Sequence, residues 1–339
     1  MKPTVSKVIF TCIVGIFIPF LFIHDPVQKS VHAFAAYSDR MRLQSGNRFI
    51  DGDFKEVLNP HDYKIIYNEP DKCKIPDGVF LLVLIHSNPT NEKLRIKQRE
   101  SCLSLTEFMG RNIVTLFLLG KVKDRVKAER LGMESLKYGD IIMEDFVDSY
   151  YNLTLKLIMG MKWASLFCPN AKYILKADDD VFINLEHIVK MLISAPSSNY
   201  MAGYVYKYAT PYRNPTSKWY VAEKQYPYKY YPPFCRGYAY LISGDLPVRL
   251  VNVSMHTPFF MIDDVFMGFL ARRVNISPTS KVGFLGPGSD DVSFCTLNMS
   301  YAVHLGSNSK RIVEYWREQQ ENPLHYTCSK VAYYISSLF

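Results

Sequence analysis

The segment Tyr173-Ile174-Leu175-Lys176-Ala177-Asp178-Asp179-Asp180-Val181-Phe182 places three consecutive carboxylates directly after an apolar run that is typical of a strand. Neighbouring carboxylates repel one another, so such a triplet is costly without a cation. Carboxylate oxygens suit a hard divalent metal such as Mg²⁺ or Mn²⁺, which commonly carries a diphosphate. The pattern therefore predicts a metal-binding turn at the end of a buried strand. A solvated acidic turn without a ligand is the alternative.

Apolar runs alternate with charged, helix-like stretches on either side of this segment. Strands are expected at 79–85, 113–119, from 140 and at 173–175, and helices at 92–105, 121–138 and from Asp148 to Pro169. Continuous apolar runs are typical of strands that are buried on both faces. This order predicts an α/β domain with a mostly parallel, Rossmann-like sheet and flanking helices, in which ligands bind beyond the carboxyl ends of the strands.

The N-terminus predicts a membrane anchor. Lys2 and Lys7 precede the uncharged apolar residues 8–23, which are short for a membrane span but near the accepted minimum. The basic flank places the N-terminus in the cytosol. We therefore expect a cytoplasmic tail at 1–7, an uncleaved transmembrane signal-anchor at 8–23, a lumenal stem at 24–75 and one large domain at 76–339. A cleaved signal peptide is the alternative.

Other features agree with a secretory route. Six of the seven cysteines follow the apolar segment, and an even number in an oxidising compartment predicts disulfides: Cys73, Cys102, Cys168, Cys235, Cys295 and Cys328. Four N-x-S/T sequons predict N-glycosylation at Asn152, Asn252, Asn275 and Asn298. The net charge of +8 is spread out, and no basic run suggests a nucleic-acid partner.

The second half of the domain contains candidate sugar-binding and acid–base residues. Twelve of the 24 tyrosines lie between Tyr200 and Tyr240. Most should pack in strands and turns, but two or three aromatic residues, Trp219 first, are expected to form a wall for a sugar. Asp263 and Asp264 follow within an apolar stretch. Paired carboxylates suit acid–base chemistry, although they could also cap the next helix.

Several longer motifs share one family pattern. They are S-x-P-x-N-x₃-R-x₂-I-R-x-[ST]-W at 87–102, F-L-L-G at 117–120, Y-G-D-I-I-x-x-D-F-x-D-x-Y-x-N-L-T-x-K at 138–156, K-x-D-D-D-x-F at 176–182, Y-P-P-Y-C-S-G at 231–237 and [ED]-D-V-[YF]-x-G at 263–268. With them the chain resembles, from about Val79 to Trp316, the family of β1,3-galactosyltransferases and β1,3-N-acetylglucosaminyltransferases. It departs from the family at Gln98, Cys102 and Arg236, where the motifs have Ile, Trp and Ser.

The resemblance implies a catalytic glycosyltransferase domain of the GT-A type in a single-pass type II Golgi membrane protein. It implies a UDP-sugar donor, Mn²⁺ or another divalent cation, and inversion at the anomeric carbon. The expected reaction is transfer of a hexose, foremost galactose, to a hydroxyl of a glycoprotein or glycolipid glycan in β1,3 linkage. UDP-GlcNAc or UDP-GalNAc as donor, or an inactive lumenal carbohydrate-binding or scaffold protein, are the alternatives. A homodimer is left open.

The resemblance also assigns roles to residues. The donor-binding set is Ser87, Arg95, Arg99, Lys176, Asp178 and Asp179. The metal ligands are Asp180 and His304, with a core histidine as the alternative for His304. The acceptor-binding set is Trp219, Tyr231 and Arg236.

The catalytic base is expected among Asp263 and Asp264. Inversion needs a carboxylate that takes a proton from the acceptor hydroxyl on the face opposite UDP. The triplet serves the metal side, which leaves these two acids. Asp264 is the expected base, because the family accepts Glu or Asp at the first position but only Asp at the second.

Overall fold

The computed structural model describes residues 47–52, 55–286 and 292–321. Its strands are β1 Ile65–Tyr67, β2 Leu81–His86, β3 Glu107–Phe108, β4 Arg111–Lys121, β5 Ile141–Val147, β6 Tyr173–Asp178, β7 Val181–Ile183, β8 Met201–Tyr206, β9 Phe234–Ser243, β10 Thr279–Ser280, β11 Phe284–Leu285 and β12 Ala302–His304. Its helices are α2 Glu92–Arg99, α3 Arg125–Tyr138, η1 Tyr150–Asn152, α4 Leu153–Phe167, α5 Leu185–Ile193, α6 Leu246–Met255, α7 Asp263–Arg273, α8 Phe294–Met299, η2 Gly306–Arg311 and α9 Ile312–Glu321.

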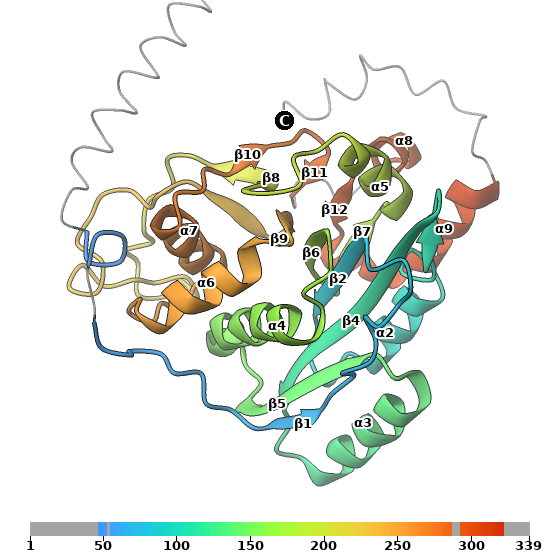
Figure 1. The fold of residues 1–339 in the computed structure, drawn as a ribbon, viewed down its shortest axis with the longest axis horizontal. Coiled ribbons are helices and arrows are strands. Elements are labelled where there is room, and N and C mark those ends of the chain that lie inside the picture. Colours follow the sequence, from blue (N-terminus) through green and yellow to red (C-terminus); the bar gives the residue numbers. More distant parts are fainter. Residues whose placement is uncertain (1–46, 53–54, 287–291, 322–339) are drawn as a thin grey trace, which may run out of the picture. The chain divides into compact units, whose positions relative to one another are not determined.

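Most of these strands form one mixed sheet (Figure 1). Its order is β1-β5-β4-β2-β6-β9-β8-β10, and β3 pairs with β4 outside this path. The four central strands β5, β4, β2 and β6 are parallel, as expected from the alternation of strands and helices. All six residues of β2 are buried, which agrees with its continuous apolar sequence.

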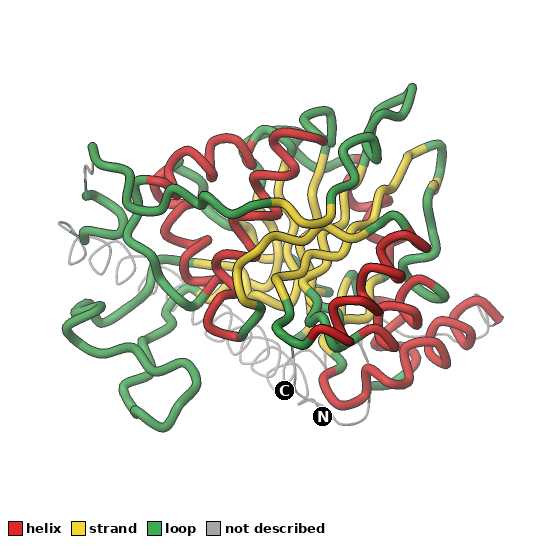
Figure 2. The backbone as a smooth tube through the Cα atoms, turned by 90° about the horizontal axis from the view of Figure 1, so that it is seen from below, coloured by secondary structure: helices red, strands yellow, loops and turns green. Residues whose placement is uncertain are grey.

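Alternate residues of the central strands pack into two hydrophobic cores, one on each face of the sheet. Leu82 and Leu84 face the core that contains α4, α6 and α7. Leu81 and Val83 face the core that contains residues of α3, α5, α8 and α9. Figure 2 shows the strands as a layer between these helices. Because successive side chains of a strand point to opposite faces, one apolar run supplies both cores.

The expected mostly parallel sheet is confirmed in a mixed form, in which β8 and β10 are parallel as well as the four central strands. β9 runs antiparallel to both β6 and β8, and β1 runs antiparallel to β5. The amino end of β9 therefore lies beside the carboxyl end of β6. Within the described residues, a second sheet of order β11-β12-β7 lies next to that edge. Strand β9 and the second sheet thus bring segments that are distant in the sequence next to the acidic turn, Asp178–Asp180.

The expected stem at 24–75 is too long. The described residues from Arg48 onward belong to the same compact unit as the rest of the domain. The ring of Phe49 is 1% exposed and stacks on Phe269 at 4.9 Å, β1 extends the sheet, and Cys73 forms a disulfide with Cys168. An anchored strand and a disulfide outweigh the polar, glycine-containing composition that suggested a linker.

The structure bears differently on the predicted membrane span and on the predicted disulfides. Residues 8–23 lie outside the described residues, and no helix of the described part is both long and apolar enough to cross a membrane. Cys295 is disulfide-bonded. Cys102 and Cys235 are buried free thiols, so the even cysteine number did not indicate pairing for them.

Candidate active site

The acidic turn lies at the carboxyl edge of the parallel strands. β6 ends at Asp178, and β2 is in register with it so that His86 pairs with Asp178. The loop that begins at Ser87 therefore lies next to the triplet, as expected for a ligand site in such a sheet. The three aspartates have three different surroundings.

Asp179 points inward and holds the loop after β2. Its side chain accepts hydrogen bonds from Ser87 Oγ at 2.6 Å and Asn91 Nδ2 at 2.9 Å, and the residue is 8% exposed. Burial raises the pKa of Asp179, although these hydrogen bonds oppose the rise. The donor contact predicted for Asp179 and Ser87 is thus indirect in this structure, because these groups bind each other.

Arg95 and Arg99 form a buried ionic network behind the same loop. Arg95 is fully buried and binds both carboxylate oxygens of Glu134, at 2.8 and 2.6 Å. Arg99 binds Glu134 and Asp140, each at 2.8 Å. The donor contact predicted for Arg95 stays a prediction, and in this conformation its guanidinium has no access to solvent. Arg99, whose side chain is 12% exposed, is similarly occupied.

Asp180 lies beside His304. The Oδ2 atom of Asp180 is 3.1 Å from Nε2 of His304, because β7 and β12 pair with Val181 opposite His304. The hydrogen bond that the Asp180 carboxylate accepts from His304 raises the pKa of His304. Two ligands at neighbouring positions of an octahedral metal with bonds of about 2.1 Å lie about 3 Å apart. Carboxylate and imidazole in this arrangement fit a divalent cation.

The pair would not enclose a metal by itself. Among the described residues, no group of three or more His, Cys, Asp and Glu side chains could hold a metal ion. The other positions would have to come from diphosphate oxygens and water, as is usual where a metal binds together with a phosphate-bearing substrate.

Lys176 connects the acidic turn with the acids on α7. This lysine is 2% exposed. Its Nζ atom lies 2.7 Å from Asp178 Oδ1 and 3.6 Å from Asp263 Oδ2, and it donates to the carbonyl of Gly237. Coulombic attraction to these carboxylates outweighs burial and raises the pKa of Lys176. The donor role predicted for Lys176 would thus act through Asp178.

Asp263 and Asp264 point in different directions. Asp263 faces Lys176, while Asp264 accepts hydrogen bonds from the backbone N–H groups of Gly237 at 3.0 Å and Val265 at 2.8 Å. Burial and the neighbouring Asp263 raise the pKa of Asp264 to about 7. A carboxylate with such a pKa can accept a proton at neutral pH.

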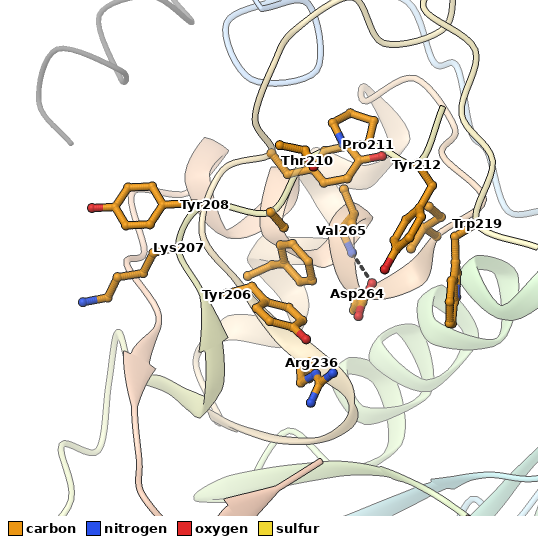
Figure 3. A pocket seen from close by; sticks show the side chains of 14 residues that line it. Tyr206, Lys207, Tyr208, Thr210, Pro211, Tyr212, Trp219, Arg236, Asp264 and Val265 are labelled. Carbon is orange, nitrogen blue, oxygen red and sulfur yellow. Dashed lines mark hydrogen bonds between the residues drawn. The ribbon is translucent and has the colours of Figure 1, made fainter. Parts of the chain in front are cut away.

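Asp264 lines a cavity of about 660 Å³ with a mostly aromatic and apolar wall. Figure 3 shows Tyr212 and Trp219 on one side of Asp264, and Tyr206 and Arg236 on the other. Trp219 is 38% exposed and packs on Tyr212 with ring centroids 5.3 Å apart. Exposed aromatic faces beside polar groups suit a sugar ring.

The three predicted acceptor residues all line this cavity, but they differ in exposure. Tyr231 is only 5% exposed and packs among Tyr226, Phe260 and Phe269. It therefore belongs to the wall beneath the cavity, whereas Trp219 and Arg236 can reach a ligand.

The model of the Galactosyltransferase family matches residues 95–282. The chain belongs to the galactosyltransferase family. It is 40% identical to the Beta-1,3-galactosyltransferase 1 of Mus musculus over 232 residues, 67% of this chain and 70% of the relative, and the same values hold for Homo sapiens. It is 34% identical to the Beta-1,3-galactosyltransferase 5 of Homo sapiens over 272 residues, 77% of this chain and 87% of the relative.

This galactosyltransferase-family chain is accordingly an enzyme of the hexosyltransferase class. Among solved structures it is similar to the galactosyltransferase LgtC in complex with donor and acceptor sugar analogs. The TM-score is 0.38 at 9% identity, covering 70% of this chain and 95% of that chain. This similarity is too weak to support an argument about function.

Sequence reasoning missed two contributors to the site of this galactosyltransferase-family enzyme. Burial together with nearby Asp263 and Asp264 raises the pKa of the Tyr150 phenol to about 12. The Lys218 ammonium lies 5.0 Å from the Tyr150 ring and 4.7 Å from the Trp219 ring, so Tyr150 lies close to both the acids and the aromatic wall. The sequence could have indicated this role, because Tyr150 occupies a fixed position of the family motif at 138–156.

Gln98 is the second missed contributor. Its Nε2 atom donates to the carbonyls of Asp179 at 2.9 Å and Val181 at 3.0 Å, the two residues that flank Asp180. The Cys102 thiol in turn donates to Oε1 of Gln98 at 2.9 Å. Gln98 and Cys102, which both depart from the family motif at 87–102, thus form one buried hydrogen-bonded pair, and this pair holds the acidic turn in place.

Proposed function

We propose that this enzyme transfers galactose from UDP-galactose to a glycan hydroxyl in β1,3 linkage, with inversion. One arrangement carries the proposal: Asp264 lines an aromatic cavity, while Lys176 links its neighbour Asp263 to the turn that contains Asp180. A sugar acceptor in the cavity and a nucleotide sugar at the turn would then lie on two sides of one cluster of acids. The β1,3-galactosyltransferase names of the relatives support the choice of reaction.

Asp264 acts as the general base in this proposal. A sugar hydroxyl is a weak nucleophile at neutral pH, so a carboxylate that removes its proton during attack accelerates the reaction. The N–H groups of Gly237 and Val265 fix the orientation of this carboxylate. Asp263 stays close to Lys176 and contributes to the raised pKa of Asp264.

Asp180 and His304 are the residues that would hold a divalent cation such as Mn²⁺. When bound, such a cation neutralises the charge that develops on the leaving diphosphate. Asp178 lies at the same turn and would contact the ribose or uridine part of the donor.

The donor is tested with the full-length protein, Mn²⁺ and a panel of neutral and anionic β-glycoside acceptors. UDP-galactose, UDP-GlcNAc and UDP-GalNAc are compared by release of UDP, and the product linkage is determined by NMR. We expect transfer from UDP-galactose and a β1,3 linkage. Preference for an N-acetylhexosamine donor would replace the proposed sugar, and absence of any turnover would favour a carbohydrate-binding protein.

We further propose a type II Golgi membrane protein with a lumenal domain. The sequons differ in access: Asn252 and Asn275 are exposed, whereas Asn152 and Asn298 are half-buried. Asn252 and Asn275 are therefore the favoured glycosylation sites. Glycosidase treatment of the full-length protein should increase its gel mobility, and a mature N-terminus just beyond residue 23 would contradict the anchor.

A further inference from the structure

Arg236 stands in the cavity wall, where the family motif has a small serine. Its guanidinium carbon lies 4.6 Å from the ring centroid of Tyr206, 5.2 Å from that of Tyr204 and 5.9 Å from that of Tyr238. Three aromatic rings thus hold one cation beside the proposed acceptor. Cation–π contacts stabilise the charge and fix its position.

No carboxylate of the described residues pairs with this cation. Within the described part of the chain no acidic group lies within 4.0 Å of the Arg236 guanidinium, although Asp264 lines the same cavity. Asp264 is instead bound by the backbone of Gly237 and Val265. A half-buried guanidinium without a carboxylate partner can form strong charge-assisted hydrogen bonds with an anion supplied by a ligand.

The shape of the group indicates what it would bind. The planar guanidinium presents paired N–H donors that match the oxygens of a carboxylate or a sulfate. Exposed Lys207 also lines the cavity, but its ammonium points away from Arg236 and Asp264 (Figure 3). A neutral sugar would gain little from the charge of Arg236.

We infer that the acceptor carries a negative charge, a carboxylate or a sulfate, on the sugar that occupies this cavity. The inference rests on the proposed function and names the class of its acceptor. The donor diphosphate is the competing ligand, because the ring of Tyr238 packs against both Arg236 and His304, at 5.9 Å from each. The acceptor is favoured because Arg236 lines the cavity together with Asp264, whereas Asp180 and His304 do not line it.

The test compares matched acceptors with the full-length protein, Mn²⁺ and UDP-galactose. One pair is a β-glucuronide and its uncharged glucuronamide, and the other is a sulfated β-galactoside and its unsulfated form. For at least one pair, we expect kcat/KM to be about tenfold or more higher for the charged member, as for a hydrogen bond to a charged group. The pair that shows the preference identifies the anion.

Variants assign the preference to Arg236. Arg236→Ser, which restores the family residue, should bring the charged-to-neutral ratio close to one, while Arg236→Lys should retain part of it. Lys207→Ser, which removes a cation from the same wall outside the tyrosine cage, should leave most of the ratio. UDP binding measured by thermal shift shows that each variant is folded.

The outcomes separate this inference from the proposed function. Equal use of neutral and charged acceptors by the wild-type enzyme would overturn the inference and leave galactose transfer intact. No transfer to any acceptor would contradict the proposed function itself. If Arg236→Ser raised the KM for UDP-galactose and left the acceptor ratio unchanged, Arg236 would serve the diphosphate and the inference would be wrong.

Discussion

His304 on β12 and Asp180 directly before β7 lie 3.1 Å apart through their Nε2 and Oδ2 atoms. Their proximity depends on the small sheet, in which Val181 pairs with His304, and on a backbone hydrogen bond from Leu305 to the carbonyl of Asp180. The pair is thus positioned by the backbone and does not depend on a bound ligand.

Loss of either side chain should weaken metal binding. Loss of a residue that only orients a metal ligand typically weakens metal binding about 10–100-fold. For Asp180→Asn and His304→Ala, which remove proposed ligands themselves, we expect the Mn²⁺ concentration at half-maximal activity to rise by at least as much. Mn²⁺ titration of UDP-galactose turnover measures the change. Asp71→Asn, at an exposed ion pair, serves as the control. Unchanged Mn²⁺ dependence in both variants would remove the metal assignment.

The raised pKa of Asp264 predicts the pH dependence of catalysis. With a pKa of about 7, this carboxylate is largely protonated at pH 6, whereas an ordinary aspartate is ionised there. Because a base must be ionised to accept a proton, kcat/KM should fall about tenfold per pH unit below this pKa. A profile measured at saturating Mn²⁺ that stays flat between about pH 5.5 and 8 would argue against Asp264 as the base.

Substitution of the same residue separates binding from chemistry. Asp264→Asn should lower the transfer rate by about 10²–10⁴-fold, the usual contribution of a general base, and retain binding of UDP with Mn²⁺. Rate and binding are measured by product formation and calorimetry. Normal turnover in Asp264→Asn together with an inactive Asp263→Asn would reverse the roles of the two acids.

Asp264 should also link stability to pH. Its pKa is raised above the ordinary value of 3.8, so between about pH 4 and 7 the folded protein binds a proton that the unfolded chain does not. The contribution of this group to stability therefore falls as pH rises through that window. The difference in Tm between Asp264→Asn and wild type should shift in favour of the variant from pH 5 to pH 8. A pH-independent difference would contradict the raised pKa.

Arg95 is expected to act through folding. Removal of one partner of a buried ion pair costs about 3–5 kcal/mol. Arg95→Met should therefore lower the free energy of unfolding by roughly this amount and leave the buried Glu134 with Arg99 as its remaining cationic partner. Urea denaturation measures it, and the double variant Arg95→Met/Glu134→Leu should recover part of the loss. A variant of normal stability with a raised KM for the donor would restore a direct role.

Gln98 should contribute to stability and to the shape of the acidic turn. Gln98→Ala removes the donor to two backbone carbonyls, at an expected cost of about 1–3 kcal/mol for the groups left unsatisfied. Cys102→Ser keeps a hydrogen-bond donor toward Gln98 and should cost less. Thermal unfolding ranks the two variants, and equal stability of wild type and Gln98→Ala would contradict this account.

The sequence predicted the elements whose pattern is local. Continuous apolar runs define β2, β4 and β6, and the charge repulsion within Asp178–Asp180 marks the end of β6. Features that depend on contacts between segments distant in the sequence could not be predicted from the sequence pattern. The insertion of antiparallel β9 between β6 and β8 depends on strand register, and the burial of Arg95 depends on Glu134, which lies on another helix. Phe49 packs against Phe260 and Phe269, so its short segment gives no local sign of a core position.

The antiparallel strands β8 and β9 have a consequence for how this enzyme can diversify. The turn after β6 is held by the parallel strands and Gln98, whereas most of the cavity wall comes from 204–236, which comprises the end of β8, the start of β9 and the one connection between them. The sequence of this segment can therefore change during evolution without disturbing Asp180 and His304. If residues 204–236 are exchanged between two related enzymes, acceptor specificity should move with this segment, while each enzyme should keep its own nucleotide-sugar donor.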